Sequence, residues 1–545
     1  MSHPYVLPCR IRWGLSAGAS TAMLAVLVVL AAFSAAGLHR GTGSAEAASG
    51  VASPSLVRLA ERSPAARVEA IVQFDNGIAP AQARKLVHAT GGRVTGDLPI
   101  INGLAVRTSA ARADKLATED GVRAVSLNAA VKKNAARSAS GIDASLLQTS
   151  YPDSVQAPRA WSGATGKGVG VAVIDTGIAG TEPDFRTSPS DSTSRVVATV
   201  ATNPYATSDN DSYGHGTHVA GIIAGNSNNR PASDPLKGHY AGVAPDANLI
   251  SVKVADEKGD ATVLDVIYGL QYVVDNKSTY NIRVVNLSLE SADAQSYKTD
   301  PLDAAAEAAW FNGIVVVAAA GNRGTAGDAV DYAPGNDPYV ISVGGVDDQG
   351  TKNTLDDTLA DWSSRGTTQD GFAKPEITAP GAHIVSNLAP NSQFTLLCPS
   401  CIVDGQYIRA GGTSMAAPVV SGGVADLLQL HPEYTPNQVK GALVTSGRKI
   451  GDLQTQEISV DQLIWSGPGT ANQGLTPNTL INQKTGNIDY TRSSWSRSSW
   501  SRSSWSRSSW SRSSWSCACS KTSSGTIDPT RSSWSRSSWS TSWTK

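Results

Sequence analysis

Five runs of apolar residues that do not alternate with polar ones recur between residues 170 and 344. Strands that are covered by helices on both faces have this composition, because neither face meets water. Helical patterns lie between the runs, and this repetition predicts an α/β fold with a doubly wound, mainly parallel sheet. Ligand sites in such sheets lie beyond the carboxyl ends of the strands. The runs are Gly170–Asp175, Ala247–Val254, Arg283–Leu289, Gly313–Ala320 and Tyr339–Gly344.

A smaller unit precedes this block. Between Arg67 and Val131, short strand patterns alternate with helical ones. Gly91 and Gly121 each follow a helical pattern, at the position where a glycine ends a helix. The order predicts a compact β-α-β-β-α-β unit, which is a small ferredoxin-like α+β domain. The expected boundaries are 48–140 for the part of the chain that holds this domain, 132–150 for a linker, and 150–480 for the α/β domain.

The N-terminus has the features of an export signal. Arg10 and Arg12 precede an apolar run from 21 to 38, and Ala45-Glu46-Ala47 matches the pattern of a signal-peptide cleavage site. We therefore expect residues 1–47 to be a signal peptide and the protein to be secreted. An uncleaved membrane anchor is the alternative, because the run approaches the roughly 18 apolar residues of a spanning helix.

The last segment, residues 481–545, is dominated by a repeat of R-S-S-W-S. Its period of five fits neither the period of a strand nor that of a helix, so we predict no conventional core. Residues 491–545 carry seven Arg, two Lys and one Asp, whereas the net charge of the whole chain is −1. The tail either binds cell-wall polymer, glycan or anionic lipid, or is a disordered secretion spacer. The acidic remainder argues against nucleic-acid binding, which needs clustered positive charge on a folded face.

The five cysteines are too few for a disulfide scaffold. Cys9 precedes the apolar run and would be lost with a cleaved signal, and Cys517 and Cys519 lie in the tail. Cys398 and Cys401 form C-P-S-C, which predicts a local disulfide in an exported protein. Redox chemistry and half of a zinc site are the alternatives, although no second pair of ligands at metal spacing accompanies the motif.

Two motifs place an acid and a histidine where sites form. Asp175 ends an apolar run in V-I-D-T-G, at the carboxyl edge of the predicted sheet. His215 lies between two glycines in G-H-G-T-H-V-A-G, at the start of a predicted helix. His218 shares that helical face and is expected to pack or to form a hydrogen bond, because a zinc-binding H-E-x-x-H motif needs another spacing and a Glu. Taken alone, Asp175 could also be a turn-capping residue.

Two further motifs supply a hydroxyl and an amide. Ser414 opens a small-residue helix in G-G-T-S-M-A-A-P. A hydroxyl at a helix N-terminus can attack a carbonyl while its own N–H helps to hold the developing oxyanion. Asn322 ends a strand of small residues in A-A-A-G-N and could donate the second hydrogen bond. Taken alone, these residues would be an N-cap serine and a turn asparagine.

Together and in this order, D-T-G, H-G-T-H-V-A-G, A-A-G-N and G-T-S-M-A-x-P resemble the motifs of the subtilisin-like serine proteases, the subtilases. G-V-A-P at 242–245 and K-P-E-I-T-A-P-G at 374–381 are similar to further family phrases. The resemblance covers roughly residues 67 to 450. It implies a subtilisin-like fold and a serine endopeptidase that acts on polypeptides.

The resemblance implies a role for each residue of the site. Ser414 attacks the peptide carbonyl, His215 takes and returns the proton, and Asp175 orients His215. Asn322 and the backbone N–H of Ser414 bind the oxyanion. The chemistry requires no cofactor. The residues expected to bind the substrate are Ser288, Leu289, Glu290, Ala319, Ala320 and Gly321.

The segment 67–131 resembles the family's propeptide, an intramolecular inhibitor that assists folding and blocks the cleft until it is cut away. Self-cleavage within the linker 132–150 is therefore implied. A surface-binding protein on an inactive protease scaffold is the alternative function, against which the intact set of site motifs argues. A hydrolase of another architecture is disfavoured, because no G-x-S-x-G elbow is found and the triad order differs.

The chain departs from the family's pattern in two places. Glu290 follows S-L where the family usually has glycine, which predicts a partly filled or negatively charged cleft edge that favours basic substrate side chains. A solvated surface carboxylate is the alternative. The stretch 225–242 is longer than usual and lacks the family's calcium-loop pattern, whereas Asp184 in T-E-P-D-F matches a position that often binds calcium. The metal content is left open, with structural calcium at Asp184 as a candidate.

Overall fold

The computed structural model describes residues 50–133, 149–450 and 456–479. The expected signal peptide, most of the linker and the Arg/Ser/Trp tail lie outside the described residues, as do Cys9, Cys517 and Cys519. No helix in the part of the chain that the structure describes is long and apolar enough to cross a membrane.

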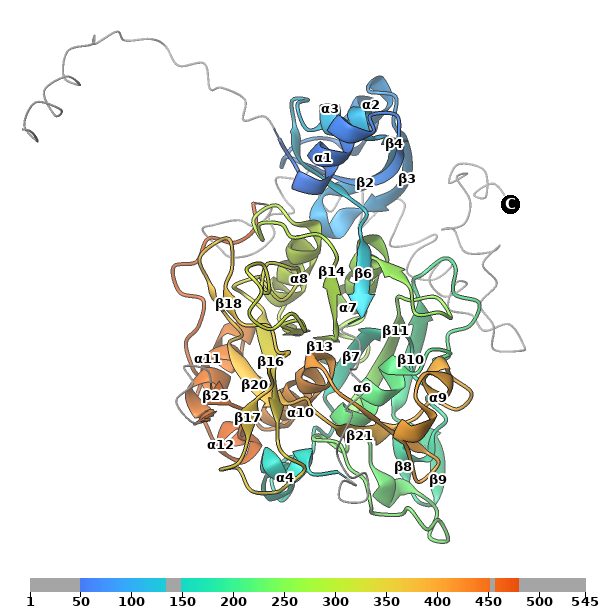
Figure 1. Cartoon of the computed structure of the whole chain (residues 1–545), viewed down its shortest axis with the longest axis vertical. Coiled ribbons are helices and arrows are strands. Elements are labelled where there is room, and N and C mark those ends of the chain that lie inside the picture. The colour runs from blue at the N-terminus through green and yellow to red at the C-terminus, as the bar shows by residue number, and fades with distance from the viewer. Residues whose placement is uncertain (1–49, 134–148, 451–455, 480–545) are drawn as a thin grey trace, which may run out of the picture. The chain divides into compact units, whose positions relative to one another are not determined.

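A ten-stranded sheet forms the centre of the larger domain (Figure 1). Its order is β10-β11-β7-β13-β15-β16-β20-β25-β24, with β17 paired to β16, and all neighbours are parallel except the β16–β17 and β24–β25 pairs. The mainly parallel α/β prediction is therefore confirmed. The strands are β7 (Gly170–Asp175), β10 (Val196–Ala201), β11 (Asn248–Lys253), β13 (Ile282–Leu287), β15 (Val315–Ala319), β16 (Ile341–Asp347), β17 (Thr358–Leu359), β20 (Ile377–Pro380), β24 (Arg448–Lys449) and β25 (Gln456–Glu457).

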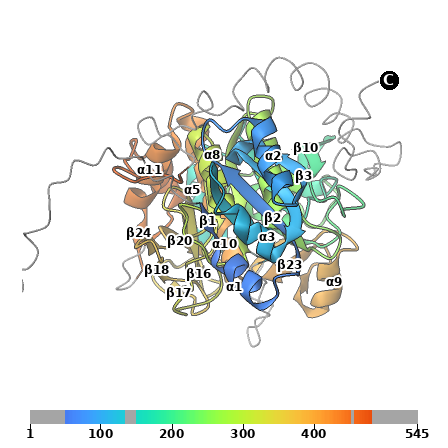
Figure 2. The same ribbon diagram turned by 90° about the horizontal axis from the view of Figure 1, so that it is seen from above.

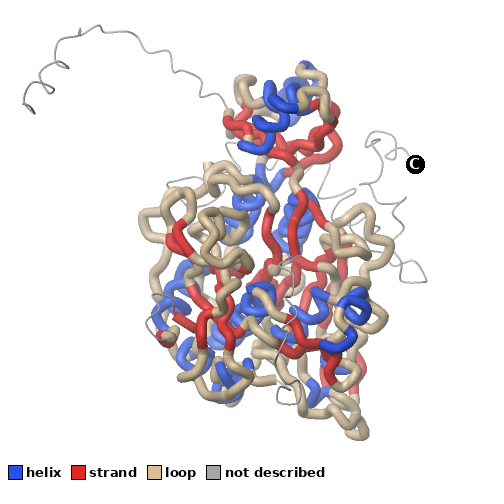
Figure 3. The backbone as a smooth tube through the Cα atoms, viewed as in Figure 1, coloured by secondary structure: helices blue, strands red, loops and turns tan. Residues whose placement is uncertain are grey.

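Helices cover the sheet and alternate with its strands along the chain (Figure 3). Helices α6 and α10 pack against each other, as do α7 and α8, and all four contact strands of the sheet. All six residues of β7 are buried, which is why its sequence shows no alternation. The helices are α4 (Tyr151–Ser154), α5 (Ala157–Ala160), α6 (His215–Ala224), α7 (Val263–Asn276), α8 (Pro301–Phe311), α9 (Gln393–Leu397), α10 (Thr413–Leu430), α11 (Pro436–Ser446) and α12 (Val460–Ile464).

The chain order changes direction at β7. From this strand the chain proceeds to β10 and β11 on one side and then to β13 and the following strands on the other. Such a switch point leaves a crevice at the carboxyl ends of the strands, and Asp175 is the last residue of β7. Shorter pairs lie outside this sheet: β8 (Arg186–Ser188) with β9 (Asp191–Ser194), β18 (Gly366–Thr367) with β19 (Ala373–Lys374), and β23 (Tyr407–Ala410) between β21 (Ile384–Asn387) and β22 (Ile402–Val403).

The smaller domain has the order β2-α2-β3-β4-α3-β5, with β5-β2-β4-β3 adjacent in an antiparallel sheet (Figure 2). This is the predicted β-α-β-β-α-β arrangement. The sequence analysis missed the first helix, α1, and the short strand β1, which adds parallel to β5. The elements are β1 (Val51–Ala52), α1 (Pro54–Arg62), β2 (Arg67–Phe74), α2 (Pro80–Ala89), β3 (Arg93–Leu98), β4 (Gly103–Ser109), α3 (Ala110–Leu116) and β5 (Val122–Leu127).

The smaller domain is bound to the larger one through a strand, β6 (Ala130–Lys133). It lies between β12 (Ala261–Thr262) and β14 (Leu289–Ser291) and is antiparallel to both. The expected linker therefore begins too early at 132, because Lys132 and Lys133 belong to this strand. Apolar residues of the smaller domain, among them Ile100 and Ile101, join the core of the larger one.

Candidate active site

Asp175 lies at the carboxyl end of β7 and is 5% exposed. Its Oδ1 accepts a hydrogen bond from the backbone N–H of Thr176 at 2.7 Å. The same oxygen lies 2.7 Å from Nδ1 of His215. Oδ2 has no hydrogen-bond partner among the described residues. The carboxylate is thus held in one orientation, with its charge directed at the imidazole.

His215 is the first residue of α6 and is 2% exposed. Because its Nδ1 faces the Asp175 carboxylate, Nδ1 carries the proton in the neutral ring and Nε2 keeps a lone pair. Nε2 is buried and has no partner among the described residues. The ring of Phe394 packs edge-on against the imidazole, with centroids 6.1 Å apart. This tautomer and this unpaired nitrogen are what a general base needs.

A close backbone approach brings α6 against the end of β7. A Cβ at Gly216 would lie 2.1 Å from the carbonyl oxygen of Gly177, so only glycine fits there. The residue that clamps the two segments together is Asp211, which is 1% exposed. Its carboxylate accepts hydrogen bonds from the Thr176 hydroxyl at 2.9 Å and from the N–H and hydroxyl of Thr217 at 2.8 and 2.6 Å.

Asp211 was missed by the sequence analysis. It also accepts from the backbone N–H of Gly214 at 2.7 Å and so caps the turn that leads into α6. Its position four residues before His215 could have indicated its role, because an acidic residue just ahead of a helix commonly caps the free N–H groups of that helix. Burial raises the pKa of Asp211, and the hydrogen bonds from Thr217, Gly214 and Thr176 oppose this shift.

Ser414 is the second residue of α10 and is fully buried. Its Oγ donates to the carbonyl oxygen of Ser288 at 3.1 Å, and the Ser288 hydroxyl donates to the carbonyl oxygen of Ser414 at 2.8 Å. The side chain of Asn286 donates to the Ser288 hydroxyl at 2.9 Å and accepts from Ser421 of α10 at 2.8 Å. The end of β13 is therefore fixed to the first turns of α10.

The amide of Asn322 has a defined orientation. Its Oδ1 accepts from the backbone N–H of Thr413 at 2.9 Å and from the Thr413 hydroxyl at 3.1 Å. With the oxygen so occupied, Nδ2 is buried and has no partner among the described residues. A buried donor without a partner is uncommon in proteins and calls for an explanation. Here it lies next to the helix turn that carries Ser414.

The residues predicted to bind substrate lie on two segments beside Ser414. Leu289 begins β14, which already pairs with the extended strand β6, with Leu289 opposite Lys133. Ala319 and Ala320 end β15 and are 1% and 7% exposed. The edge strand and the small-residue segment are thus each continuous with a residue that is hydrogen-bonded to the first turn of α10, and the extended strand β6 already lies on the edge strand.

For Glu290 the structure contradicts the alternative that the sequence left open. Its carboxylate is not a solvated surface group, because Glu290 is 6% exposed and its Oε1 lies 2.8 Å from Nη2 of Arg323. The negative charge is therefore compensated within the chain, and a preference for basic substrate side chains does not follow from Glu290 alone. Arg323 was missed because nothing in the sequence links positions 290 and 323.

The surroundings of Asp184 do not fit a calcium ion. Asp184 is fully buried, and its Oδ1 accepts from Nε of Arg230 at 2.5 Å. Its Oδ2 accepts from Asn387 at 3.0 Å and from the Tyr407 hydroxyl at 2.8 Å. Calcium takes six to eight oxygen ligands, whereas here a guanidinium already meets the carboxylate. Across residues 50–133, 149–450 and 456–479, no group of three or more His, Cys, Asp or Glu could hold a metal ion.

His218 is fully buried, and its Nε2 lies 3.2 and 3.0 Å from the carbonyl oxygens of Ile384 and Ile408. It therefore hydrogen-bonds within the core, as expected, and is not a metal ligand. Burial, together with the nearby His215, lowers its pKa to about 4. His218 is consequently neutral near neutral pH.

The predicted disulfide between Cys398 and Cys401 is confirmed. It directly follows α9, whose residues Gln393 and Phe394 donate backbone hydrogen bonds to the carbonyls of Ser212 and Tyr213 at 3.0 Å. The loop that holds the disulfide is thus attached to the segment immediately before His215.

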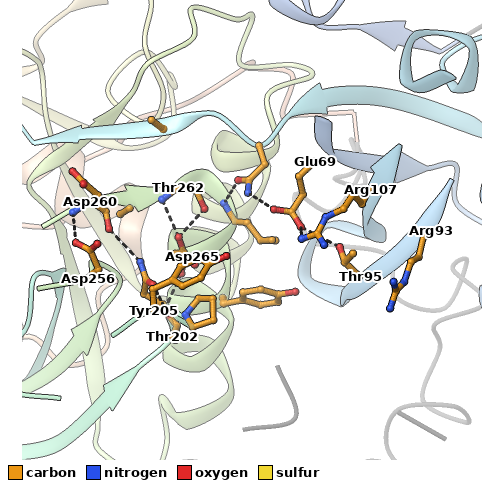
Figure 4. Close-up of a pocket in the computed structure, with 17 residues that line it drawn as sticks. Glu69, Arg93, Thr95, Arg107, Thr202, Tyr205, Asp256, Asp260, Thr262 and Asp265 are labelled. Atoms are coloured by element: carbon orange, nitrogen blue, oxygen red, sulfur yellow. Dashed lines mark hydrogen bonds and ion pairs between the residues drawn. The ribbon is translucent and has the colours of Figure 1, made fainter. Parts of the chain in front are cut away.

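A cavity of about 620 Å³ lies between the two domains, away from the residues just described (Figure 4). The smaller domain contributes Glu69, Arg93 and Arg107 to its lining, and the larger domain contributes Tyr205 and Asp265 among others. Neither Asp175, His215 nor Ser414 lines it. The cavity borders β12, one of the two strands that enclose β6.

Known proteins with similar sequences decide the family. A sequence model of the subtilase family matches residues 166–467, which is more than half of the chain. The chain belongs to the subtilase family. Serine protease AprX of Bacillus subtilis is 42% identical over 286 residues, which is 51% of this chain and 61% of AprX. Subtilisin E of the same species is 34% identical over 301 residues, or 55% of this chain and 65% of subtilisin E.

Subtilisin of Bacillus pumilus is 34% identical over 300 residues, which is 54% of this chain and 90% of that subtilase. The chain spans less than two thirds of AprX and of subtilisin E. A crystal structure of fervidolysin from Fervidobacterium pennivorans, a keratinolytic enzyme related to subtilisin, superposes with a TM-score of 0.54 at 24% identity. It covers 74% of this chain and 62% of fervidolysin, and it supports the subtilisin-like fold.

Proposed function

We propose that this subtilase is a serine endopeptidase that cleaves polypeptides through an acyl-enzyme on Ser414. The observation that supports it most is a pair of buried nitrogens, Nε2 of His215 and Nδ2 of Asn322, that have no hydrogen-bond partner within the described part of the chain. Leaving such groups unpaired costs about 1–3 kcal/mol each in a folded protein. A substrate would satisfy both, because one is a proton acceptor for the serine and the other a donor for an oxyanion.

In the proposed reaction each of these residues has one role. Ser414 Oγ attacks the peptide carbonyl carbon, and its proton passes to Nε2 of His215, whose resulting positive charge Asp175 stabilises. The carbonyl oxygen becomes an oxyanion that accepts hydrogen bonds from Nδ2 of Asn322 and from the N–H of Ser414. The C–N bond then breaks as His215 returns the proton to the leaving amine, and water releases the acyl group by the same steps.

The chain would be made as a precursor whose smaller domain, Val51–Lys133, inhibits the larger one. In support, β6 lies as an extended strand between β12 and β14, as a polypeptide substrate would. It ends at Lys133, opposite Leu289, and Leu289 adjoins Ser288, which is hydrogen-bonded to Ser414. We expect self-cleavage shortly after Lys133, in the stretch 134–148 that lies outside the described residues. Secretion through residues 1–47 belongs to the same proposal.

A fluorophosphonate probe tests the proposal. We expect it to label the wild-type protein at Ser414, identified by peptide mapping, and the wild type to hydrolyse casein. Ser414→Ala should lose both the label and the hydrolysis and remain at precursor length. A wild type that neither reacts with the probe nor cleaves casein would favour a binding protein on an inactive scaffold. N-terminal sequencing of the processed product locates the cut.

A further inference from the structure

An ion pair joins the two segments that are hydrogen-bonded to the first turn of α10, which carries Ser414. Glu290 lies on β14, two residues after Ser288 in the sequence, and Arg323 directly follows Asn322. Nη2 of Arg323 lies 2.8 Å from Oε1 of Glu290. The pair therefore connects the edge strand to the segment that holds the amide donor.

The carboxylate of Glu290 fills a space that a glycine leaves open. Gly321 has φ +102°, and a Cβ built on it would lie 2.6 Å from Oε2 of Glu290 and 2.9 Å from the Ser364 hydroxyl. Any other residue at 321 would displace the carboxylate. Glu290 thus lies against Gly321, in the wall of small residues formed by the end of β15.

The guanidinium is fixed from the other side. The backbone N–H of Arg323 donates to the Ser364 hydroxyl at 3.0 Å, and its guanidinium lies 3.7 Å from the centre of the Tyr332 ring. The side chain of Arg323 is 24% exposed and that of Glu290 is 8% exposed. At this burial each charge is only partly screened by water, so removing one partner leaves a strong local field from the other.

We propose that the Glu290–Arg323 pair sets the charge preference of this site for the substrate side chain that precedes the cleaved bond. This inference rests on the proposed function and on the assignment of β14 and the end of β15 as the walls around that side chain. As long as both charges are present, the wall is electrically neutral and an uncharged side chain is preferred. Each partner masks the selectivity that the other would impose.

Three peptide substrates that differ only in a Leu, Lys or Glu before the cleaved bond test this, with kcat/KM measured for each. The wild type should cleave the Leu peptide best. Arg323→Gln exposes the charge of Glu290 and should raise the Lys-to-Leu ratio about tenfold. Glu290→Gln exposes Arg323 and should raise the Glu-to-Leu ratio about tenfold, a size typical of charge complementarity at a binding surface. The double variant should return both ratios to within about threefold of the wild type.

Arg365→Gln is the matched control, because it removes a cation from the same surface region. The backbone N–H of Arg365 donates to the carbonyl of Gly324 at 3.1 Å, and its guanidinium donates to the carbonyl of Ser363 at 3.1 Å. Its ratios should equal those of the wild type. Single variants that keep the wild-type ratios, or that both shift in the same direction, would overturn the inference while leaving the peptidase assignment intact.

The two failures are distinguishable. A wild type that cleaves neither casein nor any of the peptides would refute the proposed function, and this inference with it. Labelling of Ser414 by a fluorophosphonate shows whether each variant has folded. Should one single variant fail to fold, the other decides alone, because the direction of its shift is specified.

Discussion

Asp175 and Asp184 are both buried, lie close together in sequence, and are paired in different ways. Asp175 meets an imidazole at 2.7 Å and keeps one oxygen without a partner among the described residues. Asp184 meets the guanidinium of Arg230 at 2.5 Å, and both of its oxygens are hydrogen-bonded. The partner of Asp175 is an imidazole, whereas the partner of Asp184 is a guanidinium, which is always charged.

The different partners of Asp175 and Asp184 predict different effects of mutation, on turnover in one case and on stability in the other. The Asp175–His215 pair at the end of β7 leaves Oδ2 of Asp175 and Nε2 of His215 without partners among the described residues, which costs folding free energy. The Asp184–Arg230 pair, in which both carboxylate oxygens are hydrogen-bonded, ties together segments that are distant in sequence, since Arg230 also donates to Asp234 at 3.0 Å and to Gln406 at 2.9 Å. We therefore expect changes at Asp184 and Arg230 to affect unfolding and changes at Asp175 to affect turnover.

The largest effect on stability is expected for Arg230→Gln. It leaves the buried carboxylate of Asp184 without its cation, which typically costs 3–5 kcal/mol, so the free energy of unfolding should fall by about that amount. Urea unfolding in a Ser414→Ala background, which excludes self-digestion, measures the change. Lys352→Gln is the matched control, because Lys352 forms an ion pair with Asp153 at 2.7 Å but is 75% exposed.

The control should lose no more than about 1 kcal/mol, as is usual for an ion pair in water. Equal losses of unfolding free energy in the two variants would show that the Asp184–Arg230 pair stabilises the fold no more than an exposed ion pair does. The structural role assigned to Asp184 would then be wrong.

A smaller effect is expected for His218→Gln, and only in acid. The pKa of His218 is about 4 in the folded protein, lowered mainly by burial, against 6.5 for an ordinary histidine. Between these values the unfolded chain binds a proton that the folded chain does not, so this residue makes the wild type less stable as the pH falls from 6.5 to 4. The stability of the wild type relative to the variant should therefore drop by up to about 3 kcal/mol over that window.

Unfolding curves of the wild type and of His218→Gln at pH 7, 5.5 and 4 give the difference in unfolding free energy at each pH. The titration of all other groups cancels in this difference, because both proteins share them. A difference that does not change with pH would mean that His218 is accessible to protons.

The smallest effect is expected for chelation. Because Arg230 holds Asp184, removing calcium with EDTA should not shift the unfolding midpoint through that carboxylate. Calcium binding followed by isothermal titration calorimetry in the wild type and in Asp184→Asn checks this. Binding that is present in the wild type and lost in Asp184→Asn would contradict the account; binding that is equal in both would place any calcium elsewhere.

The sequence predicted what short motifs and periodicity encode. The apolar runs located β7, β11, β13, β15 and β16, and Gly91 marked the end of α2, whereas α3 ends at Leu116, five residues before Gly121. The Asp-His contact could be expected because both residues occupy sheet and helix ends that a doubly wound fold brings to one edge. The assignment of catalytic roles came from the family resemblance and stays a proposal.

What the sequence could not reveal depends on contacts between distant positions. Arg230 lies in the stretch 225–242, which looked only like an extension without a calcium loop, and its partner Asp184 lies far ahead of it. Glu290 and Arg323 likewise meet through tertiary packing alone. The last two residues of β6, Lys132 and Lys133, were taken for linker because a short strand that pairs with two others needs no apolar period of its own.

Asp175→Asn measured beside Asp184→Asn tests the central claim most directly. We expect Asp175→Asn to lose about 10⁴-fold in kcat/KM on casein-derived peptides, the loss typical of removing this carboxylate from an Asp-His-Ser triad, with an unfolding midpoint close to that of the wild type. Asp184→Asn should lose stability, while its folded fraction keeps kcat within about threefold. An Asp175→Asn protein that retains kcat/KM within tenfold of the wild type would contradict the assignment of the Asp175–His215 pair to catalysis.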